Sequence, residues 1–229
     1  MPKQKIVVHS EKFLAIITGL FVAVLLISNI ASTKVFEFLG LVLDGGTILF
    51  PLSYIFGDIL TEVYGYRKSR KVIWIGFFSA LLMSVVFLIV GALPPAAGWE
   101  NQQAFEAILG FVPRLVIASL IAYFAGEFSN SFILAKMKIL TKGKRLWTRT
   151  IGSTVVGQGI DTALFATIAF WGVLPLETFV SLVVSNYIFK VGVEVLFTPA
   201  TYGIVGFLKR EEKMDVYDYN TDFTPFRLE

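Results

Sequence analysis

Six apolar stretches, each long enough to cross a lipid bilayer, constrain this chain more than any other feature. A helix rises about 1.5 Å per residue, so about 20 apolar residues cross the roughly 30 Å of hydrocarbon in a bilayer. Hydrophobic residues make up 55% of the 229 residues and charged residues only 16%, which is too apolar for a soluble domain. We therefore predict an all-α polytopic membrane protein, a bundle of six transmembrane helices. The stretches cover approximately residues 13–31, 46–64, 72–93, 112–135, 149–171 and 177–198.

The polar ends of the chain are too short to form domains of their own. We expect one transport domain at 13–208 between cytoplasmic tails at 1–12 and 209–229. The last apolar stretch runs on to Phe207, which is too long for one straight crossing. Pro199 is expected to end that helix because proline lacks an N–H group and crowds the preceding turn.

Positive charges predict the orientation of the bundle. Three Lys or Arg residues precede the first stretch, four lie in YRKSRK at 66–71, six lie at 136–149, and four follow Leu208. Cytoplasmic loops are enriched in Lys and Arg, so both termini are predicted to be cytoplasmic. The outer segment 39–46 is expected to be a loop or a short hairpin. The first stretch is too long and apolar for a signal peptide, so we retain it as a span.

The residue inventory excludes several functions. The chain contains no cysteine and one histidine, His9, in the polar N-terminal tail, so disulfides, thiolate metal sites and histidine chemistry are not expected. Neither a P-loop nor a GxSxG motif occurs. The cations lie between apolar stretches rather than on a folded basic face, which argues against nucleic-acid binding. We expect a protein that is not an enzyme and needs no cofactor or metal.

Polar residues inside the stretches are the candidate binding residues. A charged side chain facing lipid costs about 2.5 to 3.5 kcal/mol on insertion scales, so these residues are expected to point inward. Within each stretch they are spaced three or four residues apart, which places them on one face of a helix. The sets are expected to converge on one cavity. Its candidate residues are Asp58, Glu62, Glu127, Asn130, Gln158, Asp161, Asn186, Lys190 and Glu194.

Each candidate also has a structural interpretation. Glu62 lies within reach of Arg67 and the headgroups, so its role could be to anchor a helix end and not to bind a ligand. Lys190 and Glu194 could form a pair within one helix. Glu127 and Asp161 have no opposite charge at helical spacing, and their structural alternative is protonation or a pair with Lys190 across the bundle.

Long segments of the chain resemble a known family. The sequence contains SNIASTK from Ser28, FPLSYIFGDILTEVYGYRKSRKVIWIGF from Phe50, EFSNSFILAKMKILTKGKRLWTRTIGSTVVGQGIDTALF from Glu127 and KVGVEVLFTP from Lys190. Together they resemble the queuosine precursor transporter family, earlier described as vitamin uptake transporters, over residues 28–199. The resemblance implies a multi-pass importer in a prokaryotic inner membrane. Its substrates would be 7-cyano-7-deazaguanine (preQ0) and 7-aminomethyl-7-deazaguanine (preQ1), salvaged for tRNA modification.

A deazaguanine suits the candidate residues. Its edge offers two adjacent N–H donors and one carbonyl, so a carboxylate can accept both donors while an amide or a lysine donates to the carbonyl. Aromatic rings such as Phe50, Tyr54 and Tyr187 could sandwich the flat bicycle. The roles are Glu127 or Asp161 as acceptor, Gln158, Asn130 or Asn186 as donor, and Asp58 or Glu194 beside an aminomethyl cation.

Alternatives remain open from the sequence alone. The chain could be a substrate-capture subunit that requires a separate ATP-driven module, for a vitamin-like or purine-like ligand. It could also be an assembly or lipid-contact protein whose carboxylates merely pair with Lys190 and Arg114. Small residues at four-residue spacing, from Ala15 and from Ala118, allow close helix packing within one bundle or in a homodimer. The sequence is compatible both with transport coupled to a proton and with passive exchange of the substrate.

Overall fold

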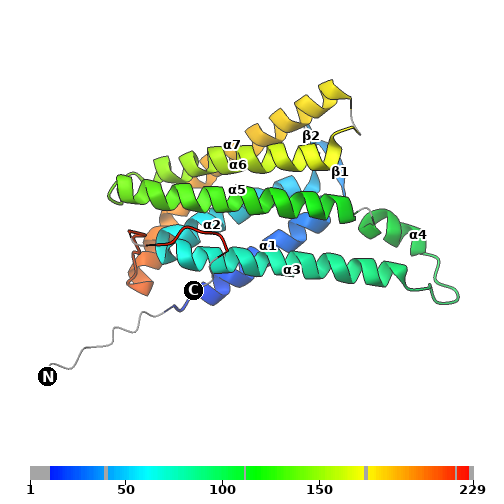
Figure 1. Ribbon diagram of the computed structural model, residues 1–229, viewed down its shortest axis with the longest axis horizontal. Helices are drawn as coiled ribbons and strands as arrows, with labels where there is room; N and C mark the ends of the chain where they lie inside the picture. The colour runs from blue at the N-terminus through cyan, green and yellow to red at the C-terminus, as the bar shows by residue number, and fades with distance from the viewer. Residues whose placement is uncertain (1–10, 39–40, 111, 173–174, 220, 227–229) are drawn as a thin grey trace.

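The computed structural model describes residues 11–38, 41–110, 112–172, 175–219 and 221–226 and is a bundle of long helices (Figure 1). Five described segments are long and apolar enough to cross a membrane, which confirms an all-α polytopic membrane protein. α6 has 25 residues but carries Gln158, Asp161 and Thr162, and it is not among those five. The predicted count of six spans therefore stays a prediction. The long helices are α1 (Leu14–Ala31), α2 (Phe50–Tyr64), α3 (Tyr66–Ala92), α5 (Val112–Leu140), α6 (Leu146–Phe170) and α7 (Leu176–Glu212).

Short elements gather at one end of the bundle (Figure 1). β1 (Val35–Phe38) and β2 (Leu41–Asp44) form an antiparallel hairpin, which confirms the short hairpin expected here and extends it to Val35. A 3₁₀ turn, η1 (Gly45–Ile48), then leads into α2. Between α3 and α5 lie α4 (Gln102–Phe105) and a π-helical turn, η2 (Glu106–Gly110).

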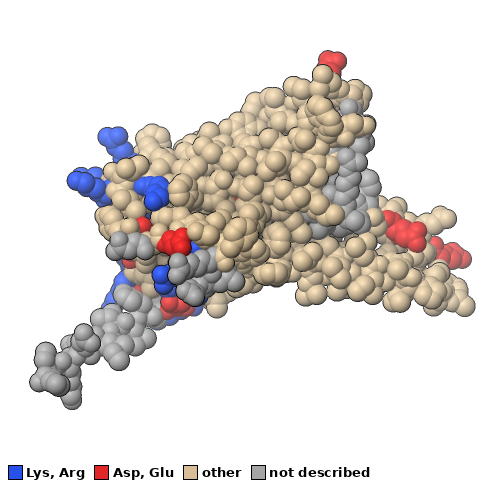
Figure 2. All heavy atoms as spheres, viewed as in Figure 1, with Lys and Arg blue, Asp and Glu red and all other residues tan. Residues whose placement is uncertain are grey.

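Lys and Arg side chains gather at the opposite end in the view of Figure 2. We call this the basic end. α1 begins here beside the end of α7, because the backbone N–H groups of Lys12 and Phe13 donate to the Glu212 carboxylate at 3.1 and 2.8 Å. Both ends of the described chain therefore lie on one side of the bundle, and the charge distribution predicts that this side is cytoplasmic. His9 and the side chain of Arg114 lie outside the described part of the chain.

A single glycine joins α2 to α3, so the interpretation of YRKSRK as a loop was wrong. Gly65 has φ 84° and ψ 163°, a conformation that residues with a Cβ rarely adopt. The basic segment forms the first turns of α3 instead. The Tyr66 N–H at the start of α3 donates to Asp218 Oδ2 at 3.0 Å. The C-terminal segment thus caps a helix that begins more than 150 residues earlier.

α7 runs without interruption from Leu176 to Glu212, so the expected end at Pro199 was wrong. Proline removes the one backbone hydrogen bond that residue 199 would donate to the Val195 carbonyl, and helices in membranes tolerate such a loss. Thr198 Oγ1 donates to the Glu194 carbonyl at 2.9 Å and Thr201 Oγ1 to the Phe197 carbonyl at 3.2 Å, so hydroxyls bind the helix backbone on both sides of the proline. Residues 200–208 are therefore part of the last helix.

The bundle buries polar as well as apolar side chains and is apolar outside. Leu82 and Leu196 expose 64% and 74% of their surface, whereas Asp58 and Glu127 expose none. A soluble protein shows the reverse distribution, because its charged groups face water. Lipid around the helices explains both the exposed leucines and the buried carboxylates, since it covers the apolar surface and favours charged groups in the interior.

α5 and α6 form the most extensive helix contact in the bundle. Glycines allow this approach: a Cβ on Gly126 would lie 2.9 Å from the Gly157 carbonyl oxygen, and one on Gly157 would lie 3.0 Å from the Gly126 oxygen. The small residues Ala118 and Ala122 of α5 are buried, so this stripe packs within the bundle. The α1 stripe differs, because a Cβ on Gly19 would meet no atom within 4 Å.

Candidate substrate site

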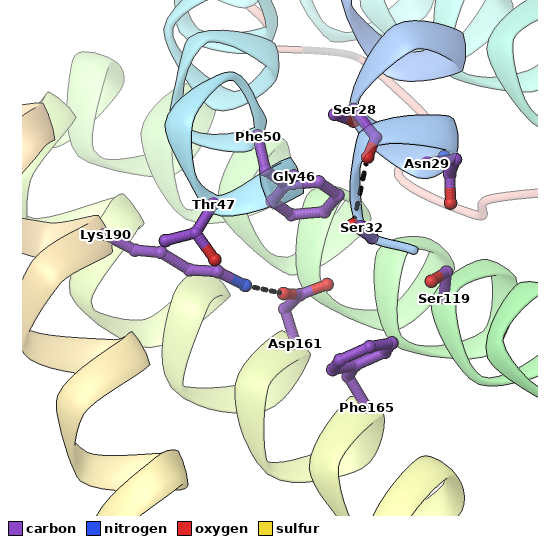
Figure 3. A pocket seen from close by; sticks show the side chains of 10 residues that line it. All are labelled: Ser28, Asn29, Ser32, Gly46, Thr47, Phe50, Ser119, Asp161, Phe165 and Lys190. Carbon is purple, nitrogen blue, oxygen red and sulfur yellow. Dashed lines mark hydrogen bonds and ion pairs between the residues drawn. The ribbon is translucent and has the colours of Figure 1, made fainter. Parts of the chain in front are cut away.

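A pocket lies in the half of the bundle away from the basic end, and Figure 3 shows its lining side chains. The last turns of α1, the η1 turn and the first turn of α2 form one side of it. α5, α6 and α7 form the other. The lining residues are Ser28, Asn29, Ser32, Gly46, Thr47, Phe50, Ser119, Asp161, Phe165 and Lys190.

Asp161 and Lys190 form an ion pair in the wall of this pocket. Lys190 Nζ lies 3.0 Å from Asp161 Oδ2, and the two side chains expose only 8% and 3% of their surface. Lys190 therefore pairs across the bundle, and not with Glu194 on its own helix. A buried pair of this kind presents both an acceptor and a donor to a ligand.

Aromatic rings border the same space. Lys190 Nζ lies 4.5 Å from the centre of the Phe50 ring, and Figure 3 shows Phe50 and Phe165 near the Asp161 carboxylate. Thr47 Oγ1 donates to Asn186 Oδ1 at 3.2 Å. Asn186 thus lies one contact behind the pocket wall. The pocket can hold a flat ring between apolar faces while polar groups bind its edge.

Sequence reasoning missed the contribution of α1. Ser28, Asn29 and Ser32 line the pocket, but SNIASTK was used only as a segment of the family resemblance and none of its residues was a candidate. The available signal was three polar residues within five positions at the end of an apolar stretch. Thr47 and Ser119 carry no comparable pattern, and only the fold places them at the pocket.

Four carboxylates converge in the interior. Tyr54 is fully buried and interacts electrostatically with Asp58, Glu127 and Asp161. Glu127 interacts in the same way with Asp161 and Glu194. The structure thus brings together Asp58, Glu127, Asp161 and Glu194, although Asp161 alone of these four lines the pocket.

The deeper polar residues are incompletely paired. Asn130 Nδ2 donates to Asp58 Oδ1 at 2.8 Å, and Glu127 Oε1 lies so close to Gly57 that a Cβ there would collide with it. Buried polar atoms usually have partners. Within the described residues several here have none: Asp58 Oδ2, Glu127 Oε2, Asn130 Oδ1, both polar atoms of Gln158 and both carboxylate oxygens of Glu194.

Glu62 lies elsewhere, at the basic end. Its Oε1 is 2.8 Å from Arg149 Nη2, 2.6 Å from Lys209 Nζ and 3.6 Å from Lys138 Nζ. Arg67, the partner considered from the sequence, is exposed. We call the four side chains the Glu62 clamp, because it joins α2, α5, α6 and α7.

Asp215 extends the clamp beyond the end of α7. Its Oδ1 lies 2.6 Å from Lys138 Nζ and 2.9 Å from Lys209 Nζ. Partial burial alone would raise the pKa of Asp215, but the hydrogen bonds from both lysines outweigh it and hold the pKa below its usual value. The clamp is therefore a set of compensated charges, unlike Asp58, Glu127 and Glu194, which form no ion pair among the described residues.

Comparisons with known proteins agree on one family. A family model described as "Putative vitamin uptake transporter" matches residues 44–204. The chain is 30% identical over 187 residues to the probable queuosine precursor transporter of Bacillus subtilis (strain 168), covering 81% of this chain and 82% of that protein. It is 26% identical over 163 residues to the queuosine precursor transporter of Escherichia coli (strain K12), covering 70% and 71%. No solved structure matches.

A further relative, the probable queuosine precursor transporter of Haemophilus influenzae, is 30% identical over 164 residues, covering 70% of this chain and 67% of that protein. These relatives are named as transporters and come from bacteria. The apolar helices make the chain a multi-pass membrane protein, and the relatives make it a transporter rather than an enzyme. The pocket, the inward-facing carboxylates and these matches lead to one conclusion: the chain belongs to the queuosine precursor transporter family.

Proposed function

We propose that this protein imports queuosine precursors, the 7-deazaguanines, across a prokaryotic inner membrane, and that the pocket containing Asp161 and Lys190 binds them. The names of its relatives support the substrate class. The observation that carries the proposal is the buried pair of Asp161 and Lys190 beside two phenylalanine rings.

The chemistry of the pair matches the edge of the substrate. Asp161 can accept both adjacent N–H groups of a deazaguanine, and Lys190 can donate to its carbonyl. Phe50 and Phe165 supply apolar faces for the flat ring.

The proposed roles follow from where each residue considered from the sequence lies relative to the pocket. Asp161 and Lys190 become the direct contacts, and Asn186 supports them through Thr47. The remaining interior candidates lie outside the lining and would contact the substrate only after the helices rearrange. They are Tyr54, Asp58, Glu127, Asn130, Gln158 and Glu194.

Equilibrium binding to the purified protein tests this assignment. Asp161→Asn should weaken binding of 7-cyano-7-deazaguanine by about 10-fold to 100-fold, because an amide cannot accept two parallel N–H groups and a charged hydrogen bond contributes about 1.5 to 3 kcal/mol. Glu177→Gln, on an exposed residue in the first turn of α7, serves as the control. Undiminished affinity in Asp161→Asn would refute the site, and no binding by the unmodified protein would refute the function.

Transport by the protein alone distinguishes the proposed importer from a substrate-capture subunit that requires an ATP-driven module. Liposomes that contain only this chain should take up labelled 7-cyano-7-deazaguanine. A capture subunit that depends on an ATP-driven module would bind the label but would not move it.

A further inference from the structure

Glu127 is a buried carboxylate without a cation. It exposes no surface, and none of the ion pairs among the described residues includes it. Oε1 accepts a hydrogen bond from Ser131 at 3.5 Å, while Oε2 has no hydrogen-bond partner in the described part of the chain. Burying an ionised carboxylate without a partner is strongly unfavourable, so this site favours the protonated form.

Its surroundings reinforce this preference, because the groups that face it are acidic or phenolic. They are Tyr54 and Asp58 from α2, Asp161 from α6, Glu194 from α7 and Tyr123 from α5 itself. Lys190 is held by Asp161. From α3, Tyr66 and Arg70 turn toward the C-terminal segment, where they donate to the carbonyls of Phe223 and Asp222, and Glu106 of η2 is exposed.

A row of hydroxyls connects Glu127 to the basic end. Ser131 Oγ lies 3.2 Å from Thr61 Oγ1 and 3.3 Å from Ser69 Oγ, and all three side chains are buried. Ser69 belongs to the basic segment at the start of α3. Hydroxyls both donate and accept, so such a row can pass a proton.

On the pocket side of Glu127, a second hydroxyl points to the same role. Tyr123 exposes 1% of its surface and interacts with both Glu127 and Asp161. Its OH has no hydrogen-bond partner among the described residues. It therefore stands between the pocket and the carboxylate as an available donor and acceptor.

We propose that Glu127 is a proton-binding site that couples substrate import to proton entry, an inference that rests on the proposed function. In the resting protein the Glu127 carboxyl carries a proton. Glu127 donates it to Ser131 Oγ, Ser131 passes its own proton to Ser69, and the buried Ser69 passes one to water that reaches it from the basic end when the helices rearrange. A proton from the pocket side then neutralises Glu127 again, so each group finishes with the proton count it started with and one proton has crossed.

Substrate and proton are linked through Asp161. When the substrate carbonyl draws Lys190 away, Asp161 loses its cation and the negative charge beside Glu127 increases. A proton on Glu127 relieves that repulsion, so each ligand favours binding of the other. The neutral carboxylate also removes an uncompensated charge from the α2, α5 and α6 interface, which makes rearrangement of these helices less costly.

Liposomes containing the protein and an internal pH-sensitive dye test the coupling. Adding uncharged 7-cyano-7-deazaguanine outside should acidify the interior. An inward proton gradient of about one pH unit should accumulate the label about tenfold if one proton accompanies each substrate. Glu127→Gln should abolish the acidification.

A second variant changes Ser131, which does not line the substrate pocket. Ser131→Ala should slow acidification several-fold while leaving exchange of labelled for unlabelled substrate unchanged. Ser131→Thr keeps a hydroxyl and should restore the rate of acidification. Ser79→Ala is the matched control, because Ser79 bonds only the carbonyl of Ile75 on its own helix.

The outcomes separate the two proposals. Substrate equilibration without acidification in the unmodified protein would overturn the coupling and leave the proposed function intact. Absence of substrate binding would overturn both. If Glu127→Gln does not fold, the serine variants decide, and unchanged acidification in Ser131→Ala would overturn the relay.

Discussion

Asp58 and Glu62 lie one turn apart on α2, both without exposed surface, yet their surroundings are opposite. Glu62 contacts three cations from three other helices, whereas Asp58 is bound only by the Asn130 amide among the hydrogen bonds of the described residues. Burial alone therefore does not assign a role. A compensated carboxylate can hold helices together, while an uncompensated one is available to a proton or a ligand.

The same contrast separates the two halves of the bundle. The Glu62 clamp and the C-terminal segment tie the helices together at the basic end. The other half contains the pocket, the Asp161 and Lys190 pair, and polar atoms that have no partner within the described chain. A transporter needs both, because a substrate path must change shape between regions that stay packed.

Removing the Glu62 charge should have the largest effect on stability. Glu62→Gln would remove the carboxylate that pairs with the buried Arg149 and would leave Lys138 with Asp215 alone, a loss of about 3 to 5 kcal/mol. Asp58→Asn is the matched variant and should change stability far less, because no cation loses a partner. Chemical unfolding in detergent measures both. Equal losses in the two variants would refute the distinction between them.

Gly57→Ala should have an intermediate effect. The new Cβ would collide with Glu127 Oε1, so the carboxylate or the α2 backbone must move, at about 1 to 3 kcal/mol. Gly19→Ala is the control: a Cβ there meets no atom within 4 Å and should stabilise the helix by about 0.5 to 1 kcal/mol. Thermal unfolding of both variants tests this. A stabilising Gly57→Ala would show that the interior is looser than described.

Asp215 should give the smallest effect, and one that depends on pH. Its pKa is lower in the folded protein than in the unfolded chain, so its contribution is present above the unfolded pKa. That contribution is lost as pH falls from the ordinary aspartate pKa, about 3.9, through the lower pKa of the folded protein. Asp215→Asn should destabilise the protein by less than about 1 kcal/mol at pH 7, because the carboxylate is partly exposed and screened.

Unfolding in detergent at pH 7 and at successively lower pH measures the Asp215 effect. The difference between Asp215→Asn and the unmodified protein should disappear at low pH. A difference that persists unchanged there would mean that the contact stabilises through packing, not charge.

Helical spacing predicted much of the interior. Residues three or four apart, such as Asp58 and Glu62 or Asp161 and Gln158, do lie inside because lipid excludes charge from the outer faces. Spacing could not assign partners, however. Arg67 was the nearest cation to Glu62 in sequence, but the cations that bind it come from Lys138, Arg149 and Lys209.

Helix ends show the same limit. Pro199 and Gly65 are both strong local signals, but α7 continues through the proline, and α3 begins directly after the glycine. One missing backbone bond does not end a long helix in a membrane, and Asp218, from a distant segment, caps the start of α3 at Tyr66. The C-terminal segment was expected to be a tail, yet Asp218 and Met214 are buried against the bundle.

The sequence by itself determined that this protein is a helical membrane bundle with its polar residues inside, because the lengths and faces of apolar stretches are local properties that lipid acts on directly. Only the tertiary structure decided which carboxylates meet cations and which do not, and that α1 helps to form the pocket. Those outcomes depend on side chains contributed by separate helices, whose distances are fixed by packing and not by spacing along the chain.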